Sequence, residues 1–226
     1  MPGISGLKLG KMDYLIWKNL SHILAGGNMD ASAAKGRDEL QQAFEPGKPI
    51  QLAQKGHRTM EKISLPKASV MTSPNPLTLV CTEKPDGTTN LATVSWWTYL
   101  SYNPGMIAYA MAKTSFSGEM VRNNHKVVLA IPGADIAKAV MGCGSTTGRN
   151  TDKVRQFDVE LTGLEGSTIK IPVHSRVAIQ CSLKEYHEVG DHYLYICNVE
   201  QVYGNEAEEA VFAWNGYGKI APAKQA

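Results

Sequence analysis

Side chains able to bind a flat, nucleotide-like ligand occur together between residues 90 and 96. Asn90, Thr93, Ser95 and Trp96 bring an amide, two hydroxyls and an indole into this short stretch. Groups of these types can hydrogen-bond the edge of a heteroaromatic ring and flank its face. The segment therefore predicts a strand that binds a ring.

A second polar segment, Lys113–Ser117, offers one ammonium and three hydroxyls at the start of an expected helix over Ser115–Asn123. The free N–H groups of a helix N-terminus, with a lysine nearby, favour an anion. Ser and Thr are also preferred N-caps without any ligand, so a simple helix cap remains the alternative. A ring site followed by an anion site predicts a bound mononucleotide.

The elements that must position these groups are mostly strands. Leu77–Thr82 is apolar and β-branched, Lys84–Thr88 has turn chemistry, and Asn90–Thr98 returns as a second strand. A third strand, Met106–Ala112, runs directly into the lysine and hydroxyl segment. Because side chains alternate along a strand, Trp96 and Trp97 would face opposite sides, and both could simply be packing residues.

The rest of the chain continues the β-rich pattern. The further expected elements are a strand over Lys126–Ile131, a helix over Ala134–Met141 capped by Gly142, a polar loop to Thr151, a short helix over Lys153–Phe157, short edge segments over Leu161–Gly166 and Ile169–Val173, a hairpin of Arg176–Tyr186 and Tyr193–Tyr203, and a last strand over Val211–Trp214. Such a chain favours a closed or partly closed barrel, which leaves few exposed strand edges.

Residues 1–64 differ from the remainder. Apolar residues between Met12 and Leu24 follow helical spacing, and a second short helix is expected over Gly36–Phe44. We expect an N-terminal extension, partly helical, over 1–64, followed by one barrel domain over 65–226. The extension would pack on the barrel or on a partner subunit. The alternative is that it docks to a membrane surface or another protein.

Composition excludes several classes of protein. The formal net charge is +2 with no basic stripe, so we expect no nucleic-acid partner. No apolar segment has membrane-spanning length, and no signal peptide is evident, so we expect no membrane span and a cytoplasmic location. The histidines lack ligand spacing, so no metal site is expected. Cys143 lies between two glycines that fit neither a Rossmann nor a P-loop motif, and a reactive, exposed thiol there stays open.

Four motifs in sequence order point to a known family: the run from Asn90 to Trp96, then Pro104, the run from Lys113 to Ser117, and Thr151–Lys153. In this order and spacing the chain resembles the flavin reductase-like, FMN-binding split-barrel family, and within it the flavoredoxin branch. The resemblance covers about two thirds of the chain, from near residue 65 to near residue 218.

The resemblance implies a split β-barrel of Greek-key type that holds FMN, and it implies which residues hold it. Asn90 and Trp96 would lie near the flavin, and Thr93, Val94 and Ser95 would line its polar edge. The implied phosphate-binding residues are Lys113, Thr114, Ser115 and Ser117. Lys153 would stabilise negative charge on the reduced flavin and raise its potential, although a solvated surface lysine is the competing interpretation. No catalytic residue of the protein itself is predicted.

The family resemblance further implies an oxidoreductase that passes hydride or electrons between NADH, NADPH or a redox protein and an acceptor. It also implies a homodimer with FMN close to the subunit interface. An electron-carrier or flavin-storage protein without turnover is the alternative. A third possibility is that the barrel binds haem, F420 or a pyridoxal derivative.

Overall fold

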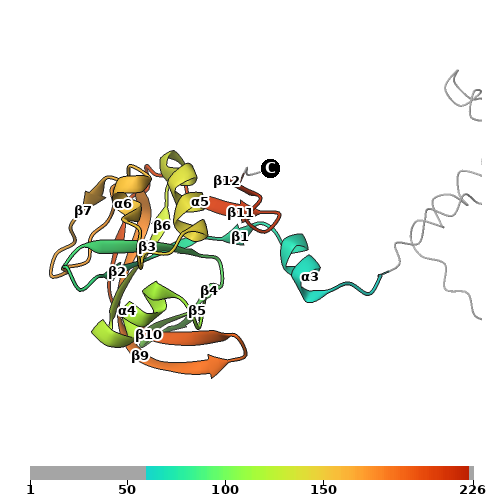
Figure 1. Ribbon diagram of the computed structural model, residues 1–226, viewed down its shortest axis with the longest axis horizontal. Coiled ribbons are helices and arrows are strands. Elements are labelled where there is room, and N and C mark those ends of the chain that lie inside the picture. Colours follow the sequence, from blue (N-terminus) through green and yellow to red (C-terminus); the bar gives the residue numbers. More distant parts are fainter. Residues whose placement is uncertain (1–59, 224–226) are drawn as a thin grey trace, which may run out of the picture. The chain divides into compact units, whose positions relative to one another are not determined.

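The structure is a computed structural model that describes residues 60–223. The two helices predicted within residues 1–59 lie outside the described residues. The larger sheet, whose strands run in the order β3-β2-β6-β9-β10-β5-β4, is antiparallel throughout (Figure 1). Its strands are β2 (Thr78–Glu83), β3 (Thr89–Val94), β4 (Trp97–Tyr102), β5 (Gly105–Ala112), β6 (Lys126–Pro132), β9 (Ser175–Val189) and β10 (His192–Gly204). The prediction of a mainly β chain with short helices is confirmed.

Smaller elements surround this sheet. A three-stranded sheet has the order β1-β11-β12, and β7 pairs with β8. The bounds are β1 Asn75–Pro76, β7 Leu161–Thr162, β8 Ile171–Pro172, β11 Val211–Trp214, β12 Lys219–Pro222, α3 Leu65–Met71, α4 Phe116–Asn124, η1 Ala134–Ile136, α5 Ala137–Ser145 and α6 Lys153–Gln156. Strand β12 was not predicted from the sequence. Within residues 60–223, no helix combines the length and the apolar character needed to cross a bilayer.

The β2–β3 hairpin forms as its turn residues predict. The Gly87 N–H donates to the Lys84 carbonyl at 2.9 Å, and the Lys84 N–H donates to the Thr88 carbonyl at 2.8 Å. Gly87 has a φ of +78°, a value that glycine adopts without steric cost. Asp86 accepts hydrogen bonds from both the N–H and the hydroxyl of Thr88, which fixes the turn.

The predicted strand over Asn90–Thr98 is divided into two, and the expectation of one strand was wrong. β3 ends at Val94, and β4 begins at Trp97 at the opposite edge of the seven-stranded sheet. Ser95 and Trp96 form the connection between the two edges, and the Trp96 carbonyl accepts from the Ala110 N–H of β5 at 2.9 Å. Apolar, β-branched composition continues through the break, so it gave no sign of the crossing.

Two hydrophobic cores share strand β2. Leu79 and Cys81 belong to the core beneath α5, whereas Val80 belongs to the core inside the barrel. Side chains of a strand point alternately to opposite faces, and both faces of β2 are covered, so its residues are buried almost without interruption. The barrel core also contains a stacked pair of buried tyrosines, Tyr109 and Tyr195, whose ring centroids are 5.0 Å apart.

Helix α5 continues beyond its predicted end. Gly142 was expected to terminate the helix, but α5 ends at Ser145 and Thr146 is its C-cap. The reason for a glycine here is packing, because a Cβ at position 142 would lie 2.4 to 2.6 Å from three ring atoms of Phe157, just after α6. Gly142 thus allows the helix to lie directly against an aromatic ring.

This contact predicts that Gly142→Ala destabilises the protein. Alanine favours a helix over glycine by about 1 kcal/mol, but the added methyl group overpacks the Phe157 contact, which typically costs about 1–3 kcal/mol. Urea unfolding should therefore show a net loss of stability. The control is Gly163→Ala, where no atom lies within 4 Å of the added Cβ. A Gly142→Ala protein at least as stable as the wild type would contradict the packing explanation.

Candidate functional site

A cavity of about 530 Å³ lies where the two edges of the barrel sheet are bridged. It is lined by the end of β3, the 95–96 connection, the end of β5, the start of α4, the last turn of α5 and the segment that follows it. Eight of the ten predicted ligand-binding residues line this cavity: Thr93, Val94, Ser95, Trp96, Thr114, Ser115, Ser117 and Lys153. The segment predicted to bind a ring and the segment predicted to bind an anion therefore line the same cavity, although they belong to separate elements.

The side formed by β3 and the 95–96 connection carries fixed polar groups and one open aromatic face. The Thr93 hydroxyl donates to the Val140 carbonyl at 2.5 Å, and the Tyr217 hydroxyl donates to the Ser95 hydroxyl at 3.0 Å. Trp96 is 56% exposed, and its ring centroid lies 4.9 Å from that of His192. Trp96 is therefore not a core residue. Trp97 packs against the barrel core instead, as expected for a packing residue.

Hydroxyl groups surround the first turn of α4. Ser115 is the N-cap, and its Oγ accepts from the Gly118 N–H at 3.2 Å. Ser117 is buried, and its Oγ accepts from the Asn90 amide at 2.7 Å. Thr114 is exposed and lines the cavity just before the helix. The cap predicted from sequence is present, and it opens onto the cavity rather than onto bulk surface.

Asn90 and Lys113 do not line the cavity. The Lys113 ammonium forms an ion pair with Glu188 and lies 5.9 Å from the centroid of the Tyr193 ring. The charge of Lys113 is therefore paired at the β9–β10 hairpin. The hairpin was predicted, but local sequence did not reveal that β10 pairs with β5 and so brings Glu188 close to Lys113. The geometry therefore does not favour a direct contact between Lys113 and a phosphate in this cavity.

Asn90 lies behind the cavity wall. Besides donating to Ser117, its amide lies 3.4 Å from the Thr82 hydroxyl, and its buried Oδ1 has no hydrogen-bond partner among the described residues. A Cβ at position 148 would lie only 1.9 Å from this Oδ1. Gly148 is thus needed for the loop after α5 to approach Asn90. Asn90 positions Ser117 and this loop rather than touching the cavity itself.

Lys153 is buried, at 3% exposure, which excludes the interpretation as a solvated surface lysine. Its ammonium donates to the backbone carbonyls of Leu91 and Cys143, both at 2.8 Å. A lysine ammonium has three N–H donors, so one remains beyond these two bonds in a residue that lines the cavity. Burial lowers the pKa of Lys153 from its usual 10.5, since desolvation disfavours the charged form.

Cys143 also lines the cavity, but its thiol is not exposed as the glycine-flanked position suggested. The residue lies within α5 and is 1% exposed. Burial raises the pKa of Cys143 to about 11, which disfavours the reactive thiolate. The other three cysteines are likewise free and buried. The structure therefore gives no support for a reactive thiol at position 143.

Sequence reasoning missed part of the lining. Ser145, at the end of α5, and Thr146, Thr147 and Gly148 directly after it line the cavity, and His192 and Tyr217 come from distant parts of the chain. A signal for the first group was present, because residues 142–148 consist almost entirely of glycine and hydroxyl side chains. Local sequence did not indicate His192 or Tyr217. The pairing of β10 with β5 brings His192 to the cavity, and the turn between β11 and β12 brings Tyr217 there.

An antiparallel sheet with a cavity where its two edges approach is the architecture of the split-barrel proteins. Residues 70–221 match the model of the flavin reductase like domain, so the chain belongs to that family of flavin-related oxidoreductases. The predicted resemblance is confirmed, and flavoredoxins are among the similar structures.

Three comparisons illustrate the relationship. An NADH:FAD oxidoreductase from Streptomyces globisporus has a TM-score of 0.65 at 15% identity, over 74% of this chain and 99% of that one. A flavoredoxin from Methanosarcina acetivorans has a TM-score of 0.64 at 19% identity, over 74% and 94%. An uncharacterized protein from Archaeoglobus fulgidus is 24% identical over 127 residues, which are 55% of this chain and 68% of that protein. At these identities the solved structures support the fold.

Proposed function

We propose that the chain binds FMN in the 530 Å³ cavity and works as an FMN-dependent oxidoreductase. The observation that carries the proposal is the meeting of a polar strand end, a hydroxyl-rich helix start and a buried ammonium around one cavity. Its volume falls within the range of about 300–1,000 Å³ typical of small-molecule sites. The structure is also similar to that of an FMN-binding protein from Thermus thermophilus, at 20% identity and a TM-score of 0.62.

The isoalloxazine would lie along Thr93–Trp96, and the phosphate would lie at Thr114, Ser115 and Ser117. The α4 N-terminus favours the phosphate through its free N–H groups and its dipole. Close backbone approach supports the fit, because a Cβ at Gly144 would lie 3.2 Å from Thr93, against which the last turn of α5 packs. Asn90 would support the site by holding Ser117 and the Gly148 loop in place.

When bound, FMN supplies the redox chemistry, and the protein supplies binding, orientation and electrostatics. Lys153 would place a positive charge at the cavity wall, where it favours negative charge on the reduced cofactor. Two backbone carbonyls already fix its ammonium, so the charge needs little reorganisation to act. Lys113 would influence the site only from a distance, because Glu188 pairs its charge.

The electron donor would be NADH or NADPH, and electrons would leave to a flavin, a redox protein or a small acceptor. The structural likeness to an NADH:FAD oxidoreductase supports this direction. The likeness to flavoredoxins supports the second candidate, a carrier that exchanges electrons with a redox protein and has no turnover of its own. The four free cysteines suit the reducing cytoplasm, where we propose that the protein works.

The phosphate placement predicts that Thr114→Val weakens FMN binding. A hydrogen bond to a charged group typically contributes about 1.5–3 kcal/mol, so the dissociation constant of FMN should rise about tenfold or more. Riboflavin, which lacks the phosphate, should bind both proteins equally. Fluorescence titration of the flavin-depleted protein measures both constants. Thr162→Val, at an exposed threonine of β7 outside the cavity, is the matched control. Equal FMN affinities for the Thr114→Val and wild-type proteins would place the phosphate elsewhere.

The enzyme and carrier proposals predict different kinetics with nicotinamides. Mixing the FMN-loaded protein with NADH or NADPH in an anaerobic stopped-flow instrument should bleach the flavin absorbance within seconds if the protein is a reductase. Bleaching by dithionite but by neither nicotinamide would reject the reductase and favour the carrier. Purified protein that neither is yellow nor takes up FMN would reject both.

We also propose a homodimer assembled through the β4 edge. Tyr99, Leu100 and Tyr102 of this edge strand are 51%, 49% and 93% exposed, and such apolar edges mark interaction surfaces. Light scattering during size-exclusion chromatography should give the mass of two subunits, and Leu100→Lys should give a smaller species. A wild-type monomer that retains FMN would contradict this assembly.

A further inference from the structure

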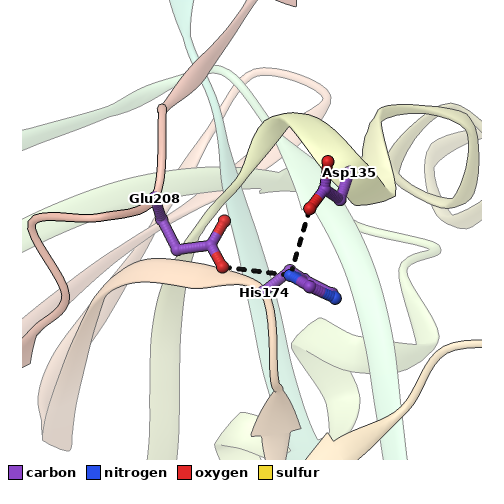
Figure 2. A group of neighbouring side chains, drawn as sticks. All are labelled: Asp135, His174 and Glu208. Carbon is purple, nitrogen blue, oxygen red and sulfur yellow. Dashed lines mark hydrogen bonds and ion pairs between the residues drawn. The ribbon is translucent and has the colours of Figure 1, made fainter.

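Three ligand-type side chains from distant parts of the sequence converge outside the flavin cavity. Asp135 belongs to η1, His174 follows β8, and Glu208 lies between β10 and β11. Figure 2 shows both carboxylates directed at the same ring nitrogen of His174. The His174 Nδ1 lies 3.0 Å from the Glu208 Oε1 and 3.5 Å from the Asp135 Oδ2. None of the three residues lines the flavin cavity.

Gly133 brings the segments that carry His174 and Glu208 together. A Cβ at position 133 would lie 2.2 Å from the Glu208 Oε2 and 3.1 Å from the His174 carbonyl oxygen, so both segments pass close to this glycine. The Gly133 N–H donates to the His174 carbonyl at 2.8 Å, and Gly133 forms a β-bridge with Ala210. The backbones that carry His174 and Glu208 are therefore both tied to residue 133, directly before η1.

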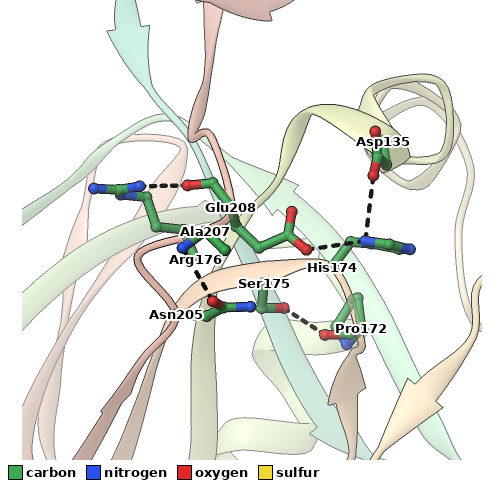
Figure 3. Close-up of polar contacts among 8 residues, drawn as sticks. All are labelled: Asp135, Pro172, His174, Ser175, Arg176, Asn205, Ala207 and Glu208. Carbon is green, nitrogen blue, oxygen red and sulfur yellow. Dashed lines mark hydrogen bonds and ion pairs between the residues drawn. The ribbon is translucent and has the colours of Figure 1, made fainter.

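A set of polar contacts fixes the same two segments from the other side (Figure 3). The Arg176 guanidinium donates to the backbone carbonyls of Glu206 and Glu208, and the Ala207 N–H donates to the Asn205 side chain at 3.1 Å. The Ser175 hydroxyl donates to the Pro172 carbonyl at 2.6 Å. In these contacts Arg176 bonds to backbone oxygens, and the Glu208 carboxylate contacts His174 instead.

The spacing of these atoms suits a metal ion. Zinc binds histidine nitrogen and carboxylate oxygen at about 2.0–2.2 Å, which places neighbouring ligand atoms about 3.0–3.4 Å apart in octahedral or tetrahedral sites. The two measured separations from Nδ1 lie close to this range, and all three ligand atoms lie within 4.8 Å of one another. Asp135 is 73% exposed, so its carboxylate has room to turn toward a shared ion.

We propose that Asp135, His174 and Glu208 bind one divalent transition-metal ion of the Zn²⁺ type. One imidazole nitrogen and two carboxylate oxygens form a ligand set with a net charge of −2, and they leave coordination positions for water. The ion joins η1, the β8–β9 connection and the β10–β11 connection. All three ligands lie outside the cavity proposed for the flavin, so the ion links these three segments and takes no part in flavin chemistry.

The competing occupant of this position is a proton on Nδ1. The hydrogen bond to Glu208 raises the pKa of His174, with smaller contributions from the negative charges of Glu208, Asp135 and Glu160. A protonated imidazole would pair with both carboxylates without a metal. The two occupants differ in what they predict, since only the metal site takes up Zn²⁺ with saturable stoichiometry.

Isothermal titration of the chelator-treated, full-length protein with ZnCl₂ tests the proposal. The wild type should bind one Zn²⁺ per chain through this site. Both His174→Ala and the shape-conserving Asp135→Asn should bind it at least about tenfold more weakly, which corresponds to about 1.4 kcal/mol. The matched control is His187→Ala, whose imidazole lies 3.2 Å from Glu185 in a simple exposed pair. This variant should keep the wild-type affinity.

Thermal unfolding provides a second measurement. Zn²⁺ should raise the melting temperature of the wild type and of His187→Ala, but not that of Asp135→Asn. No saturable Zn²⁺ binding by the wild type would overturn the proposal and leave the proton as the occupant. Wild-type affinity in a folded Asp135→Asn protein and in His174→Ala would also overturn it. FMN binding measured on the same samples reports separately on the proposed function.

Discussion

The buried ammonium of Lys153 is the interaction on which the cavity depends. It joins the Leu91 carbonyl of β3 to the Cys143 carbonyl of α5, so it fixes the helix against the strand that forms the cavity wall. Burying this charge has a desolvation cost, which the lowered pKa of Lys153 reflects. Two carbonyl acceptors offset part of that cost, and the remaining N–H group is available to a ligand.

The division between β3 and β4 explains why a cavity exists at this place. A continuous strand would have closed that face of the barrel, whereas the crossing at Ser95 and Trp96 spans the two edges of the sheet. It also leaves the Trp96 indole exposed beside His192. The same break therefore creates the opening and supplies an aromatic surface at its rim.

The sequence was most informative where chemistry and local conformation coincide. The turn at Lys84–Thr88, the N-cap at Ser115 and the short helix after Asp152 all follow from residue preferences within a few positions. The prediction failed where tertiary contacts decide. The crossing at Ser95 depends on which strands pair, and the extension of α5 past Gly142 depends on the Phe157 ring.

The same distinction applies to the candidate sites. Eight cavity residues were predicted because they cluster in short motifs, whereas the ion pair that removes Lys113 from the lining connects residues that are 75 positions apart. Histidine spacing likewise gave no sign of the Asp135, His174 and Glu208 cluster, since each residue comes from a different segment. Local spacing reveals a site on one element, and long-range topology is needed for a site between elements.

Strand β2 belongs to both hydrophobic cores, and this couples the unfolding of the two layers. Leu79 and Cys81 hold the layer under α5, while Val80 between them holds the barrel interior. Loss of this strand would expose apolar surface on both faces at once, so neither layer can melt while the other stays intact. The helical layer and the barrel should therefore unfold as one cooperative unit, and the cavity between them should persist until the whole domain unfolds.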